Sequence, residues 1–332
     1  TIALAVVVLV LIAVVVGLAR QAVYQIGDLH ADVAQFLSRQ SGLHIEFDAI
    51  AGSWKGLAPR FQIEQLRVSQ SDQHEAAIVA RQVDLEVLLL QSALQRQPRL
   101  RLNVAGLDLT LSKRNGRMEI DGLTLAPSAE SSHFRLNDFA DMVSRQPRLS
   151  VTDSQLQLKG LYAQDVTLSV QQLQIESGKV RRYASGRVTL RGPSNLSFDL
   201  KAQVRGSLLQ QGSISGDVYL DAGFADWLPW IPAEQRKFRN VTLDSMQGGN
   251  ESWLKFRNGK LVDAASRFSN HDFNLTSNSE VQPPRVKSLA GVARWQTDVH
   301  GNWNLGVENL RMVTPSFVWQ PKDLQVSSVL QD

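Results

Sequence analysis

The residues that could carry catalysis or bind a metal are scattered along this chain of 332 residues. The sequence has no cysteine, which excludes disulfides, thiolate zinc sites, iron–sulfur clusters and cysteine nucleophiles. The six histidines stand apart from one another, with no H-E-x-x-H motif and no paired-ligand spacing. Asn258-Gly259-Lys260-Leu261 is no phosphate loop, because neither Ser nor Thr follows the lysine. We therefore expect a protein that is not an enzyme, with no catalytic residue, no metal site and no cofactor.

The charge balance argues against nucleic acid as a partner. Lys and Arg number 35 against 32 for Asp and Glu, a formal net charge of +3. Spread over the whole chain, this excess is too dilute to form a basic footprint for a phosphate backbone. The short basic groups at residues 179–182 and 236–239 are typical of solvated faces.

One aromatic cluster stands out, formed by Trp227 and the stretch Leu228-Pro229-Trp230-Ile231-Pro232. The simpler interpretation is a core plug or a turn packed on a sheet. Because indole rings suit boundaries between apolar and wet surroundings, a membrane-interface contact or a lipid gate is the alternative.

Residues 1–19 form an uncharged stretch made almost wholly of Ala, Val, Leu and Ile. About 18 or more such residues are enough for a helix to span the ~30 Å hydrocarbon core of a bilayer. A cleavable signal peptide is the alternative, because Gly17-Leu18-Ala19 could imitate its cleavage site. The apolar region of a signal peptide, however, would be shorter than residues 1–19. We expect an uncleaved transmembrane helix over residues 1–19, with anchor residues Leu4, Val8, Leu11, Val15 and Leu18.

Residues 20–42 have the pattern of an amphipathic helix, with apolar residues at helical spacing and Ser41-Gly42 as a stop. This helix either caps the end of a sheet or lies at the membrane surface, although its polar face lacks the Lys and Arg expected at a membrane surface. Its apolar positions are Val23, Ile26, Leu29, Val33, Phe36 and Leu37.

Beyond Gly42 the apolar period becomes two and stays so almost to the end of the chain. This alternation is typical of strands that place one face on apolar material and the other in water, an exposure that antiparallel sheets tolerate. Few later stretches could form helices: 88–96, 134–145 and 223–238. The fold predicted is mainly β, an elongated antiparallel sheet with a few short amphipathic helices, over residues 43–332.

At intervals two successive apolar residues stand three positions apart instead of two, as in Ile63 to Leu66 and Val104 to Leu107, so the apolar positions change from odd to even numbers or the reverse. We call this change a parity shift. The same step joins Val170 to Leu173 and Val307 to Leu310. If the apolar side chains stay on one face, each step requires a β-bulge or a bend, and repeated bulges would curl a long sheet into a trough. Alternatively, each step passes a strand from one layer of a sandwich to the other.

A short repeat accompanies these strands: Arg96-Gln97-Pro98-Arg99-Leu100 recurs as Arg145-Gln146-Pro147-Arg148-Leu149. Each copy follows a short helical stretch and precedes an alternating strand. A repeated helix–strand unit is favoured over coincidence.

The N-terminal region resembles the AsmA-like family of bacterial envelope proteins, most closely the YhdP-type proteins. The resemblance rests on the strand Leu43-His44-Ile45-Glu46, then Ser53-Trp54, Pro59 and the strand Phe61-x-Ile63-x-x-Leu66-x-Val68. The later strand Asp217-Val218-Tyr219-Leu220-Asp221, which runs into Asp226-Trp227-Leu228, is also similar. Because YhdP-type proteins are several times longer, we expect this chain to be an N-terminal portion, truncated at its C-terminus.

The resemblance implies a protein of the bacterial inner membrane, with a single N-terminal span and its β domain in the periplasm. The sheet would curl into a long hydrophobic groove, a β-taco-like fold, that carries phospholipids toward the outer membrane. The alternative is an envelope assembly or scaffolding factor that adds strands of inner- or outer-membrane protein partners to its sheet edge. The groove floor expected from the alternation, which could equally fill a closed sandwich core, is Leu102, Val104, Leu107, Leu109, Leu111, Val166, Leu168 and Val170.

Overall fold

The computed structural model describes residues 26, 30–56, 58–70, 75–96, 99–114, 117–123, 146–160, 165–178, 180–206, 214–238, 240–277, 285–298 and 301–328. These ranges are mainly strand, as the alternation predicts. The chain divides into two compact units, Thr1–Asp165 (unit 1) and Val166–Asp332 (unit 2), which are described separately. The predicted anchor, residues 1–19, lies outside the described ranges. Within those ranges, no helix combines the length and apolar character needed to cross a membrane.

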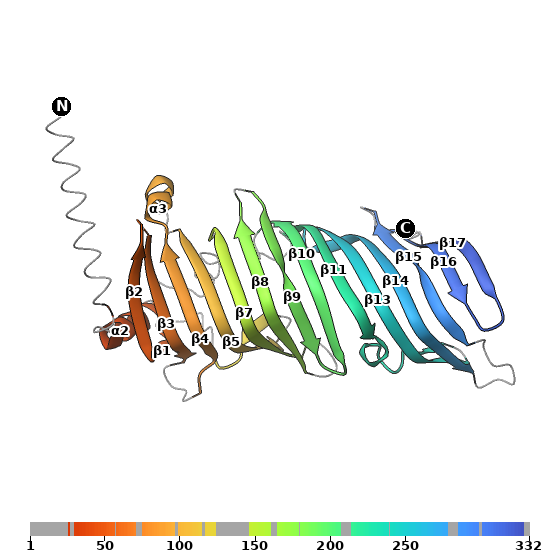
Figure 1. The fold of residues 1–332 in the computed structure, drawn as a ribbon, viewed down its shortest axis with the longest axis horizontal. Helices are drawn as coiled ribbons and strands as arrows, with labels where there is room; N and C mark the ends of the chain where they lie inside the picture. Colours follow the sequence, from red (N-terminus) through yellow and green to blue (C-terminus); the bar gives the residue numbers. More distant parts are fainter. Residues whose placement is uncertain are drawn as a thin grey trace, which may run out of the picture. The chain divides into compact units, whose positions relative to one another are not determined.

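Among its described residues, unit 1 has two helices and a mixed sheet whose main strands lie side by side (Figure 1). Its elements are α2 (His30–Ser41), β1 (His44–Glu46), β2 (Ala49–Lys55), β3 (Ala58–Ser69), β4 (Ile78–Val87), α3 (Leu89–Gln95), β5 (Leu100–Arg114), β6 (Arg117–Ile120) and β7 (Arg148–Lys159).

Helix α2 lies within the predicted amphipathic stretch 20–42, of which residues 20–25 and 27–29 are outside the described ranges. Gly42 follows it with φ +70°, and its N–H donates to the carbonyl of Ser38 at 2.9 Å, which ends the helix in the left-handed conformation that glycine adopts readily. The N–H of Ile45 donates to the Ser38 Oγ at 3.0 Å. Helix α2 therefore lies against β1 at the edge of the sheet.

The strand order of unit 1 differs in one pairing from the antiparallel sheet predicted. Strands β1 and β2 lie end to end along one edge of β3, and β3, β4 and β5 pair antiparallel in succession. Strand β7, however, pairs parallel with β5, so the prediction of a wholly antiparallel sheet is wrong. The reason is the hairpin strand β6, which pairs with residues 111–114 at the far end of β5. Residues 121–147 connect β6 to β7 along the sequence, and a connection of a dozen or more residues is what a parallel pairing requires.

Unit 2 is an antiparallel succession in which each main strand pairs with the next (Figure 1). The short strand β12 lies end to end with β11 along the same edge of β13. Its elements are β8 (Val166–Ser177), β9 (Arg182–Arg191), β10 (Asn195–Arg205), β11 (Ser215–Asp226), the 3-10 turn η2 (Leu228–Trp230), β12 (Lys237–Phe238), β13 (Val241–Arg257), β14 (Lys260–Ser277), β15 (Val286–Thr297), β16 (Trp303–Val313) and β17 (Val318–Ser328).

Of the three short helices predicted, the first is present as α3, the second (134–145) lies outside the described ranges, and the third is wrong. Residues 223–226 still belong to β11, and the rest of the stretch holds the turn η2, further turn residues and strand β12, with no α-helix. Pro229 and Pro232 explain this difference, because each lacks the N–H that a continuing helix needs.

The parity shifts are β-bulges and bends within single strands. In unit 1, Gln65, Gly106 and Asp153 adopt left-handed φ values of 54°, 65° and 47°. They occupy neighbouring register positions in β3, β5 and β7, so the bends form one line across the sheet. In unit 2 the register shifts between Val170 and Gln172, and between Val307 and Leu310. The expectation of a bulge or a bend is confirmed: the steps in unit 1 are bends, because the register continues across them without a shift, and those in unit 2 are bulges.

No second sheet packs against either unit among the residues that the structure describes. The strand contacts run between hydrogen-bonded neighbours, apart from the contacts of α2 with β1 and of η2 with β13. Each unit is therefore a curled, open sheet, and the sandwich alternative is wrong.

Candidate functional site

The predicted floor residues of β5 share one face of unit 1 and are all half-buried. Leu102 lies between Leu85 and Leu149, and Val104 between Val83 and Val151. The floor residues Leu109 and Leu111 have apolar partners as well, Ile78, Leu156 and Leu158. Leu107 follows the bend at Gly106 and pairs with Ala80. The register thus assembles apolar rows that run across strands, where cross-strand pairs stabilise a sheet.

The predicted floor residues of β8 lie in unit 2 and differ in burial. Val166 and Val170 are buried, with 1% and 3% of their surface exposed, whereas Leu168 is half-buried and lies opposite Leu190 on β9. These residues and those of β5 belong to different units, so each set is assigned to its own sheet.

The aromatic cluster after β11 is a packed turn that covers the start of β8. The indole N–H of Trp227 donates to the carbonyl of Gly248 at 2.9 Å, and that of Trp230 donates to Ser194 Oγ at 2.8 Å. Trp230 and Val166 both lie close to Gly192. A Cβ added at Gly192 would lie 3.0 Å from the Trp230 ring and 3.4 Å from the Val166 side chain. The plug interpretation therefore describes this turn, which closes one end of the apolar face of unit 2.

A continuous apolar row crosses unit 2 from β8 to β17, and we call it the ladder. Its residues are paired directly from strand to strand and therefore share one face. It consists of Ile175, Ala184, Ala202, Val218, Leu254, Ala264, Trp295, Leu305 and Val326. Every member up to Trp295 is half-buried, and Leu305 and Val326 are exposed. An apolar row that no described element covers is typical of a surface that binds another apolar body.

The alternation rule finds the ladder only in part. The three alanines are too small to signal an apolar face, and Trp295 has polar and charged neighbours along the chain. The signal that identifies all of them is the pairing register, which the sequence does not show.

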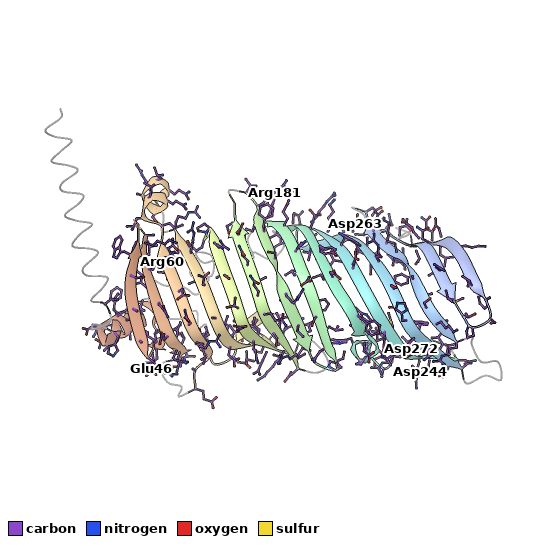
Figure 2. The ribbon with its side chains drawn as sticks, in the orientation of Figure 1. Glu46, Arg60, Arg181, Asp244, Asp263 and Asp272 are labelled. Atoms are coloured by element: carbon purple, nitrogen blue, oxygen red, sulfur yellow. The ribbon has the colours of Figure 1, made fainter. Side chains whose placement is uncertain are left out.

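The opposite face of each sheet is polar and hollowed. In unit 1, a hollow of ≈ 530 Å³ contains the ion pairs Arg60–Glu86 (2.8 Å) and Arg101–Glu86 (3.2 Å); Figure 2 labels Arg60. In unit 2, Arg187 donates two hydrogen bonds to Asp199, at 2.7 and 2.8 Å, and this contact lowers the pKa of the Asp199 carboxyl. A larger hollow of ≈ 920 Å³ lies beside this pair, around Tyr219. The ion pairs of each unit thus lie on the face opposite its apolar rows.

Metal-ligating side chains do not converge in the described part of the chain: no group of three or more His, Asp or Glu residues could hold a metal ion.

Comparison with known proteins gives one match, the family model described as YhdP protein, which covers residues 1–331. Searches of curated proteins and of solved structures return no match. The family match confirms the resemblance indicated by Ser53-Trp54 and the strand that follows.

Proposed function

Because the chain belongs to the YhdP protein family, we propose that it is a lipid-transfer protein in which phospholipid acyl chains lie along the apolar faces of the curled sheets. Its proposed setting is the bacterial envelope, with an inner-membrane span at residues 1–19, the sheets in the periplasm and transport toward the outer membrane. The proposal includes no covalent step and no cofactor, since sliding along an apolar face requires neither.

The ladder is the observation that carries this proposal. It extends in one line through every main strand of unit 2, so an acyl chain lying across the strands would contact apolar side chains throughout. The rows through Leu102 and Val104 offer the same surface in unit 1. The half-burial of these side chains supports an open face rather than a closed core.

The energy of lipid exposure explains why such a face is useful. A diacyl phospholipid has ~30 methylene-type groups, and exposing them to water costs about 0.8 kcal/mol each, roughly 25 kcal/mol in total. An apolar sheet face that receives these groups removes most of that cost, while the head group stays in water.

Site-specific photo-crosslinking in cells tests the proposal, with the crosslinker at Leu107 in unit 1 or Leu168 in unit 2. The matched controls are the adjacent positions Asp108 and Thr167. Their side chains lie on the polar face, because successive residues of a strand point to opposite faces. We expect phospholipid adducts, identified by mass spectrometry, at the two leucine positions and not at the controls. Equal capture at leucine and control positions, or no lipid at either leucine, would overturn the proposal.

Strand addition to a protein partner is the second candidate function, and strand β17 favours it. Among the described residues β17 pairs with β16 alone, and Val318, Leu324 and Val326 on it are more than half exposed. An edge of this kind offers backbone groups to an incoming strand. Crosslinkers at Leu324 and Val326 that captured outer-membrane proteins, with none capturing lipid at Leu168, would favour this function over lipid transfer.

A further inference from the structure

The hollow of ≈ 920 Å³ in unit 2 is lined mainly by residues that alternate with the ladder along the strands, and the ladder residues Ala184, Ala202, Val218 and Leu254 also contribute to its lining. Tyr219 and Trp253 line it, and they alternate along their strands with the ladder residues Val218 and Leu254. Its volume falls within the ~300–1,000 Å³ that is usual for small-molecule sites. The side chains of Tyr219 and Trp253 alternate to the face opposite the ladder, so a ligand that contacts both of them is not the lipid lying on the ladder.

Two aromatic rings form the centre of the hollow. Tyr219 and Trp253 are direct cross-strand partners on β11 and β13, with ring centroids 5.4 Å apart and planes tilted by 49°. The guanidinium of Arg267 lies 5.4 Å from the centroid of the Trp253 ring, and Glu251 holds Arg267 at 3.3 Å. Trp253 nevertheless remains 39% exposed. The two tilted rings therefore form an aromatic surface that is partly open to solvent, and we call it the platform.

The polar groups around this platform are of both signs and nearly balance. Four cationic side chains and three carboxylates line the hollow, together with Gln174, Gln203 and Ser185. Two of the cations are already paired, Arg267 with Glu251 and Arg294 with Glu308 at 2.8 Å. The other charged groups are Lys201, Lys255, Glu176, Asp217 and Asp263, of which Asp263 lies near the start of β14 (Figure 2). The lining thus supplies both donors and acceptors without the cationic excess that a polyanion needs.

We propose that this hollow binds an uncharged oligosaccharide. A pyranose ring has faces of C–H groups that stack on aromatic rings and a rim of hydroxyls that both donate and accept hydrogen bonds. The platform of Tyr219 and Trp253 matches the C–H faces, and the surrounding amides, lysines and carboxylates match the hydroxyl rim. The hollow crosses strands β8 to β15 and is open along its length, which suits a chain of several sugar residues.

Ligand-observed saturation-transfer NMR on the purified chain tests this proposal with cellotetraose, maltotetraose and N-acetylated chitotetraose. We expect transfer to at least one of the three. Trp253→Ala and Tyr219→Ala should each weaken its binding roughly tenfold, because each removes a stacking surface. Trp253→Phe, which keeps a ring, should retain most of the affinity.

The matched control is Trp303→Ala on β16, because Trp303 is 38% exposed and lies outside the hollow. This variant should bind as the unmodified chain does. The proposal is overturned if none of the three sugars shows transfer, if binding survives Trp253→Ala, or if Trp303→Ala and Trp253→Phe lose it to the same extent as Trp253→Ala. Tighter binding of a sulfated maltotetraose would also overturn it, since the ligand would then be a polyanion.

Discussion

The backbone N–H of Leu107 donates a hydrogen bond to the side-chain Oγ of Ser154 at 3.0 Å, although 47 residues separate the two along the chain. The bend at Gly106 interrupts the regular pairing of β5 with β7 at residues 106 and 107. Ser154 is 2% exposed, and its hydroxyl also donates to the carbonyl of Thr152 at 2.7 Å. A buried serine thereby provides an acceptor for a backbone N–H at the bend.

Ser154→Ala should destabilise unit 1 by about 1–3 kcal/mol, because the part-buried N–H of Leu107 loses its acceptor. Urea unfolding followed by circular dichroism measures the loss. Ser169→Ala is the control, since Ser169 is also buried but its Oγ has no hydrogen-bond partner among the described residues. That variant should be neutral or slightly stabilising. An equal loss in both variants would contradict the role assigned to Ser154.

Gly106→Ala should be more destabilising than Gly56→Ala. Both glycines have left-handed φ values, +65° and +62°, so each substitution carries the same cost of about 1–2 kcal/mol. At Gly106 the new Cβ would also come within 2.7 Å of the Cβ of Arg81, whereas at Gly56 it meets nothing within 4 Å. The difference in unfolding free energy therefore measures the close approach of β4 and β5. Equal losses of unfolding free energy in the two variants would contradict the prediction, because they would show that β4 and β5 move apart at no cost to accommodate the new Cβ.

Arg187→Gln should remove a pH-dependent part of the stability of unit 2. The hydrogen bonds from Arg187 lower the pKa of Asp199 in the folded protein from its ordinary value of 3.8. The stabilisation is therefore present above that ordinary value and is lost as the pH falls through the lowered one. The unfolding free energies of the unmodified chain and the variant should differ at pH 7 and converge in acid. A difference in unfolding free energy between the two chains that stays constant down to the lowest accessible pH would contradict this prediction.

The phenol of Tyr219 should titrate above the ordinary tyrosine pKa of 10.0. Partial burial in the hollow raises this pKa most, and Asp221 and Glu251 raise it further. Subtracting the ultraviolet titration of Tyr219→Phe from that of the unmodified chain isolates this residue. Asp221→Asn should lower the Tyr219 pKa without returning it to 10.0, because burial is the larger cause. A midpoint at or below 10.0 in the unmodified chain would count against the prediction.

Leu168→Asp should reduce lipid transfer between vesicles by at least about tenfold, because it places a charge on the apolar face of β8. Thr167→Asp adds the same charge at the adjacent position, on the polar face, and should transfer lipid normally. Circular dichroism shows whether both variants keep the strand content. Equal activity of the two variants would indicate that lipid does not travel along this face.

The bends illustrate how much of the fold is predictable. The step from Val104 to Leu107 requires an extra residue in the strand if both side chains share a face, and Gly106 provides it with a left-handed φ. The parallel pairing of β5 with β7 is not predictable in the same way, because it depends on where hairpin strand β6 returns the chain. The repeat at Arg96–Leu100 and Arg145–Leu149 hints at this pairing, since the strands that follow the two copies run parallel.

By itself, the sequence determined that the chain is built from strands with one apolar face, where these strands bend, and which family the chain belongs to. These properties depend on residues that are close together along the chain. Only the tertiary structure decided that Ile175 and Val326 are the two ends of one apolar row. It also placed Tyr219 and Trp253 side by side over a hollow on the opposite face. The physical reason is register, because turns and bulges set which residues of neighbouring strands meet, and a shift of one residue would move every side chain to the other face.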